Sequence, residues 1–84
     1  MDEKTLRALV EAGAVKRVQI VAEGAQFHVE AHTGKGVVVA STGKGTPKTW
    51  RTLDAAARWV RALGLGEAAL ELSRWSPEQR ALAL

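Results

Sequence analysis

The sequence predicts an α+β domain of two layers, in which helices cover one face of an antiparallel sheet of three to five strands. Three observations predict this class. Apolar residues recur with helical spacing near the start of the chain and again after Thr52. Between these segments apolar and polar residues alternate as in half-buried strands, and glycine-containing turns separate the alternating runs. The 84 residues, 46% of them hydrophobic and 25% charged, suit one small domain comprising residues 1–84.

The first helix is expected over residues 2–12. Leu6 and Val10 lie on one face at helical spacing, and Leu9 lies beside them. Asp2 is suited to cap the first turn, and Gly13 is suited to end the helix in a left-handed conformation.

Strands follow over residues 15–22 and 26–31, joined by a short turn at Glu23-Gly24. Their alternation around a tight turn predicts an antiparallel hairpin. A third strand is expected over residues 37–40, and its continuous apolar run predicts that it is the more buried one. Residues 48–51 fit either a short fourth strand or an extended lead-in to the next helix.

The second helix begins after Thr52, a favourable N-cap, and Gly64 stands where it should stop. One apolar face is expected to comprise Leu53, Ala56, Ala57, Val60 and Leu63. A last strand is expected over residues 67–72, and Ser76-Pro77 marks the start of a short terminal helix reaching about Leu82. The predicted order is therefore helix, three or four strands, helix, strand, helix.

Several classes of function are excluded by composition. The chain has no cysteine, which removes disulfides, thiol nucleophiles and cysteine-ligated metal centres. It also has no apolar run near the roughly 18 residues that a membrane span requires, and no secretion leader is recognisable. We therefore expect a soluble, cytoplasmic protein that does not associate with membranes.

Catalytic and cofactor-binding constellations are not found. His28, Glu30 and His32 share one face of a strand, but a solvated sheet surface explains them without a metal ion. The segment Gly43–Thr46 resembles a phosphate-binding loop only superficially, because Gly45 follows Lys44 where Ser or Thr is required. The sequence predicts no enzyme, no cofactor and no metal site.

The charge is unevenly distributed along the chain. The net charge is +3, yet residues 31–61 hold six basic residues against Asp54 alone, and no acidic residue occurs between Ala31 and Leu53. Such a segment is either a solvated pair of loops with lysines for solubility or an electrostatic patch for phosphate groups.

Nucleic-acid binding is the function that this patch favours. The sequence Thr-Gly-Lys-Gly occurs twice, at either end of the third expected strand, and presents Lys35 and Lys44 on glycine turns where a phosphate backbone can approach closely. Lys48, Trp50 and Arg51 follow on the next extended segment. We take these five residues as the candidate DNA-contacting site.

A protein-interaction module without nucleic-acid affinity is the alternative. Small domains with a limited core often dimerise, and either the edge at residues 37–40 or the region around Trp75 could pair with another chain. The apolar end of the chain, residues 81–84, could dock on the same or another protomer. A homodimer is thus among the expected partners, beside DNA.

One stretch resembles a known family. This stretch comprises residues 50–64, with the sequence Trp-Arg-Thr-Leu-Asp-Ala-Ala-Ala-Arg-Trp-Val-Arg-Ala-Leu-Gly, and the strand expected at residues 67–72. It resembles the small ParC-like, partition-associated proteins of bacterial plasmids and integrative elements. The resemblance covers about residues 48–72. It implies a mobile-element setting and an accessory role near DNA, and it implies no catalytic residue.

The order of elements is also similar to two nucleic-acid-binding folds. Double-stranded RNA-binding domains share it, but their basic cluster at the second helix is replaced here by Leu53-Asp54-Ala55. The small sheet-reading DNA-binding domains of some integrases share three strands followed by a capped helix. That likeness implies groove contacts by basic and aromatic side chains of the sheet.

Overall fold

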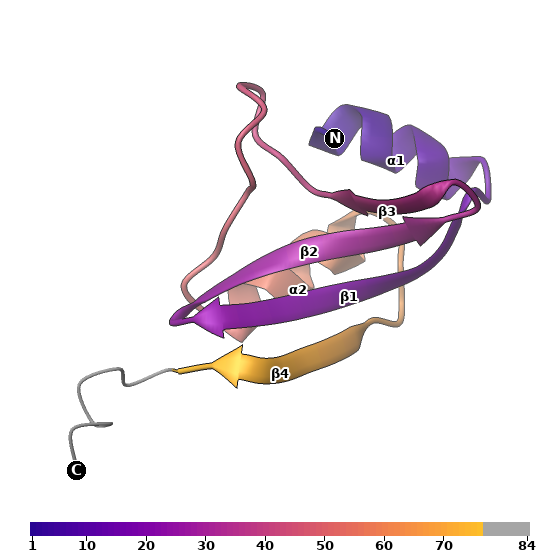
Figure 1. Ribbon diagram of the computed structural model, residues 1–84. Coiled ribbons are helices and arrows are strands. Elements are labelled where there is room, and N and C mark those ends of the chain that lie inside the picture. The colour runs from indigo at the N-terminus through magenta and orange to yellow at the C-terminus, as the bar shows by residue number, and fades with distance from the viewer. Residues whose placement is uncertain (77–84) are drawn as a thin grey trace, which may run out of the picture.

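The computed structural model describes residues 1–76, and the terminal helix expected from Pro77 lies outside them. Two helices and four strands follow in the order α1 (Glu3–Glu11), β1 (Val15–Gly24), β2 (Gln26–Thr33), β3 (Gly36–Val39), α2 (Leu53–Ala62) and β4 (Ala69–Trp75). Both helices pack on the same face of a four-stranded sheet, with α2 behind β1 and β2 in Figure 1. The predicted α+β class is confirmed.

The strands lie in the spatial order β3-β2-β1-β4. The hairpin of β1 and β2 is antiparallel as expected, with Glu23 paired to Gln26, and β2 pairs antiparallel with β3. β4, however, joins β1 in parallel, so the sheet is mixed. Residues 48–51 form an extended lead-in to α2, held to the hairpin by a single bridge between Trp50 and Phe27.

The core lies between the sheet and the two helices. It is aliphatic apart from Phe27, and α1 contributes only Leu6, which is 1% exposed. From α2, Ala56, Val60 and Leu63 are buried, whereas Leu53 and Ala57 of the expected apolar face remain exposed. Within residues 1–76, no helix covers the opposite face of the sheet.

The prediction that the third strand is the more buried one is wrong. β3 is the short edge strand of the sheet, and its Val37 and Val39 are 53% and 36% exposed. These two valines point to the face without helices, since they pair beside His32 and Glu30 of β2, whereas Val38 packs on the core. An apolar run thus marks a strand without showing that both its faces are covered.

The helix boundaries follow from the predicted capping residues. The Asp2 carboxylate accepts a hydrogen bond of 2.9 Å from the Thr5 amide, and the Thr52 hydroxyl accepts one of 3.2 Å from the Ala55 amide. Gly13 and Gly64 follow the two helices with φ of 73° and 103°, where a side chain would be strained. These four local predictions are confirmed.

Candidate nucleic-acid interface

The two Thr-Gly-Lys-Gly segments fold into the same kind of turn. In each, the threonine hydroxyl accepts a hydrogen bond from the amide of the lysine two residues on: Lys35 to Thr33 at 3.1 Å, and Lys44 to Thr42 at 3.3 Å. The final glycine of each, Gly36 and Gly45, has a positive φ of 131° and 89°. Both lysines are consequently exposed at turn tips between residues that have no side chains.

The second turn closes a small loop that comprises residues 40–48. The Thr42 amide donates to the Thr46 carbonyl at 2.8 Å, and the two threonine hydroxyls lie 2.8 Å apart. At its base, the Lys48 amide donates to the Ala40 carbonyl at 2.9 Å. Lys44 is therefore displayed on a hydrogen-bonded loop, which rises away from the sheet in Figure 1.

The backbone segments that carry the basic residues follow one another along β2, and we call these residues the basic row. The turn carrying Lys35 follows the last residue of β2, and the Ala40 amide bonds to Val29 in the middle of the strand. Trp50 and Phe27 exchange two backbone hydrogen bonds of 2.8 and 2.9 Å near its first residue. At about 3.3 Å per residue, the row from Lys35 to Arg51 spans on the order of 20 Å.

Trp50 lies within this row as a packing residue. Its ring centroid is 5.1 Å from that of Trp59 on α2, and the Lys48 ammonium lies 5.6 Å from the Trp50 ring. The Trp59 indole nitrogen donates to Glu3 of α1 at 3.0 Å. Trp50 thus holds the lead-in against α2 and orients Lys48.

One carboxylate partly offsets the positive charge here. Hydrogen bonds from Arg7 and Trp59 lower the pKa of Glu3 below its ordinary value, and the charge of Lys48 contributes to this shift. Glu3 is therefore ionised near neutral pH, and Lys48 is the least available cation of the row.

Arg51 lies apart from the two lysine turns. It lines a groove with Leu53, Leu72 and Trp75, at the end of the sheet where β1 turns into β2. Within residues 1–76, the four ion pairs involve none of Lys35, Lys44, Lys48 and Arg51. By contrast, Arg58 on α2 is held by Asp54 at 2.9 Å.

Two further cations, which the sequence analysis did not single out, lie beside the Lys35 turn. The Cε atom of Lys16 is 3.9 Å from the position that a side chain on Gly34 would take. Arg17 pairs with His32 of β2, immediately before that turn. They were overlooked because residues 1–30 carry a net negative charge, and only the hairpin register brings these cations next to Lys35.

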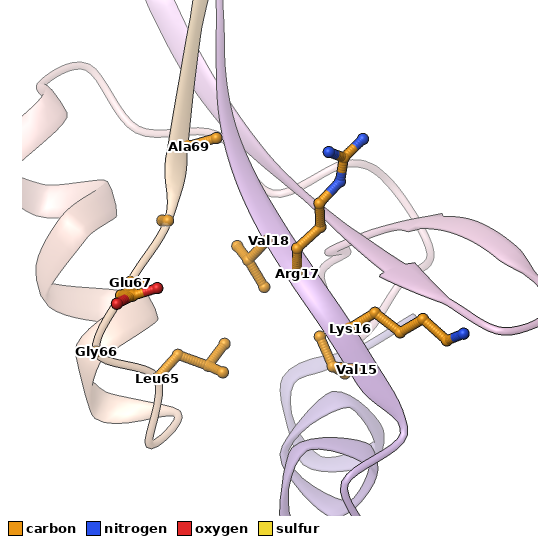
Figure 2. A pocket seen from close by; sticks show the side chains of 9 residues that line it. Val15, Lys16, Arg17, Val18, Leu65, Gly66, Glu67 and Ala69 are labelled. Carbon is orange, nitrogen blue, oxygen red and sulfur yellow. The ribbon is translucent and has the colours of Figure 1, made fainter.

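Figure 2 shows Lys16 and Arg17 extending away from a groove of about 580 Å³ between β1 and the segment preceding β4. Val18 and Leu65 point into this groove, whereas Lys16 and Arg17 are exposed. The two cations therefore face solvent at the end of the sheet that carries Lys35. Together, Lys16, Arg17 and Lys35 form what we call the Lys35 cluster.

The histidines of β2 make local hydrogen bonds on the face of the sheet without helices. His28 Nε2 lies 2.9 Å from Glu30 Oε2, and His32 Nε2 lies 3.1 Å from Gln19 Oε1. No group of three histidine or carboxylate side chains within residues 1–76 is arranged to hold a metal ion. Each histidine ring thus has a hydrogen-bond partner on β2 or on the adjacent strand β1.

Comparisons with known proteins found no matching family model, no similar curated protein and no similar solved structure. Neither helix of the described residues has the length and apolar character needed to cross a membrane.

Proposed function

We propose that this protein is a non-enzymatic DNA-binding accessory module of a bacterial plasmid or integrative element, acting in the cytoplasm. The proposal rests on one observation: two turns of the same hydrogen-bonded design present Lys35 and Lys44 to solvent, and neither lysine has an ion-pair partner within residues 1–76. Lysine on a glycine turn suits phosphate contact because the point charge needs no fixed geometry.

The length of the basic row supports a contact with one DNA strand. A span on the order of 20 Å corresponds to about six nucleotides at the 3.4 Å rise of one strand. In this arrangement the Lys35 cluster contacts one end of the site, Lys44 and Lys48 contact the middle, and Arg51 contacts the other end. Contacts to phosphates alone confer affinity without a sequence preference.

Trp50 takes a supporting part in this proposal. Its ring packs on Trp59 and lies near the Lys48 ammonium. We assign it the role of holding the lead-in that carries Lys48 and Arg51, rather than that of a platform on which a base stacks. Replacing Trp50 by Phe should then weaken DNA binding only modestly.

Fluorescence anisotropy of a labelled DNA duplex tests the proposal. If Lys35, Lys44, Lys48 and Arg51 each neutralise one phosphate, a plot of log affinity against log salt concentration should have a slope of about −3.6. The affinity should then fall on the order of 10²-fold between about 50 and 200 mM salt. Reversing both Lys35 and Lys44 to Glu should abolish binding while circular dichroism shows an intact fold.

Arg58→Glu is the matched control for either single reversal, Lys35→Glu or Lys44→Glu, since it makes the same change in charge at a side chain that Asp54 already engages. If Arg58→Glu weakens DNA binding as much as Lys35→Glu or Lys44→Glu does, the net charge of the protein governs affinity and not the position of the lysines. Absence of binding at the lower salt concentration would refute the DNA proposal. It would favour the alternative, an interaction module without nucleic-acid affinity.

A further inference from the structure

The two edges of the sheet differ in how they are covered. At β3, the Met1 nitrogen donates to the Val39 carbonyl at 3.0 Å, and the Met1 carbonyl accepts from the Ser41 amide at 2.8 Å. β4 pairs with β1 on one side only, and within residues 1–76 nothing pairs with its outer side. Apart from the Ser73 amide, which donates to Glu71 Oε1 at 2.7 Å, its seven residues present a row of backbone donors and acceptors to a further strand.

The same edge carries exposed apolar side chains. Leu70, Leu72 and Trp75 of β4 are 43%, 41% and 44% exposed, and Leu53 of α2 facing them is 39% exposed. They line two adjoining hollows of about 350 and 290 Å³ between α2 and β4. Exposed apolar side chains next to an unpaired strand are typical of an interface between proteins.

The strand β4 is complementary to itself. Glu71 and Arg74 pair beside Val21 and Glu23 of β1, on the face without helices. Within one copy, Arg74 Nη1 lies 3.7 Å from Glu23 Oε2, and Glu71 Oε1 accepts hydrogen bonds from the Ser73 amide and hydroxyl. Leu70 pairs beside the core residue Ile20, and the Trp75 ring lies 6.3 Å from that of Phe27, so these two side chains are on the helix face. The first half of the strand thus carries an apolar residue followed by an acidic one, Leu70 and Glu71. The second half carries a basic residue followed by an apolar one, Arg74 and Trp75.

Antiparallel alignment of two copies brings these halves together. Leu70 of each copy then meets Trp75 of the other on the helix face, and Glu71 of each meets Arg74 of the other on the open face. The register shift between β1 and β4 after Glu71 makes this alignment feasible, because it places Glu71 and Arg74 on one face although three positions separate them. Two ion pairs and two apolar contacts arise from one twofold axis.

We propose that the protein forms a symmetric homodimer in which the two β4 strands pair antiparallel and join the two sheets into one of eight strands. This inference goes beyond the DNA-binding function and does not depend on it. A second copy supplies a strand, which the backbone edge of β4 requires.

Sedimentation equilibrium of the full chain tests the dimer. The mass should rise from 9.0 kDa towards twice that value as the protein concentration increases. Because the interface is small, the transition is expected at micromolar concentrations, within a range of about 1 to 500 µM. A mass that stays at 9.0 kDa throughout this range would overturn the proposal.

Charge reversal within β4 tests the pairing itself. Arg74→Glu removes the contact with Glu23 of its own chain and places two carboxylates opposite each other at both symmetric positions, and it should weaken dimerisation by about tenfold or more. Glu71→Arg should also weaken dimerisation, because it places two arginine side chains opposite each other at both positions. The double variant Glu71→Arg/Arg74→Glu restores opposite charges and should dimerise again, and a mixture of the two single variants should form heterodimers.

Lys44→Glu, which makes the same change in charge far from β4, is the control and should leave the dimer intact. Leu82→Asp/Leu84→Asp, in the apolar end of the chain, should also leave it intact. Loss of the dimer in either variant, or a dimer that Arg74→Glu leaves unchanged, would place the interface elsewhere and overturn the proposal. The DNA titration is unaffected by these outcomes, so the two proposals can fail separately.

Discussion

Leu6 should contribute more to stability than any other side chain of α1. It is 1% exposed and is the only buried residue of the helix, which otherwise reaches α2 through polar bonds such as that of 2.7 Å from Arg7 to the Ala62 carbonyl. Leu6→Ala removes buried methyl groups and leaves a cavity, at a cost of about 3 kcal/mol. A domain of this length has a total stability of only about 4–13 kcal/mol, so the loss is a large share.

Urea unfolding followed by tryptophan fluorescence measures this loss at low micromolar protein concentration. With a slope of about 1 kcal/mol per molar urea, the midpoint should fall by about 3 M while the slope stays the same. Leu53→Ala is the matched control, since Leu53 is 39% exposed and its truncation should cost less than about 1 kcal/mol. Equal effects of the two substitutions would refute the view that α1 is held chiefly by Leu6.

Two further predictions concern Glu3 and the Lys44 turn. Because hydrogen bonds from Arg7 and Trp59 lower the pKa of Glu3 below its ordinary value of 4.5, Glu3 adds stability that is fully present above pH 4.5 and is lost as the pH falls through the lowered pKa. Thermal unfolding of the wild type should therefore depend on pH more steeply below pH 4.5 than that of Glu3→Gln, and identical profiles would contradict this. Gly45 has a φ of 89°, so Gly45→Ala should cost about 1 kcal/mol or more and weaken DNA binding by displacing Lys44. Gly43→Ala, with open space around it and no positive φ, should be neutral in both assays, and equal effects at the two glycines would argue against a strained turn.

The candidate site was predictable in part. The duplicated Thr-Gly-Lys-Gly sequence indicated two similar turns, and the hydrogen bonds at Thr33 and Thr42 confirm that they are alike. Lys16 and Arg17 could have been found only by aligning the hairpin, since they lie far from Lys35 in the sequence. The packing of Trp50 on Trp59 joins two segments whose relative position no local pattern specifies.

Features that depend on neighbouring residues follow from the amino-acid sequence alone. Asp2 and Thr52 cap the helices, Gly13 and Gly64 end them, and alternation defines the hairpin, because each of these involves atoms only a few residues apart. The order of helices and strands, and hence the α+β class, follows from such local signals.

Which strand faces lie open and which edges remain unpaired within residues 1–76 depends on how the elements pack together. β4 joins β1 in parallel and leaves Leu70 and Leu72 beside an exposed Leu53, although both segments have the apolar patterns of core elements. The physical reason is that hydrophobicity drives burial without specifying a partner, so an apolar face can be covered by another element of the chain or left for another molecule. On β3 and β4 the structure leaves such side chains uncovered, and at β4 this exposure defines the surface that we assign to a second copy.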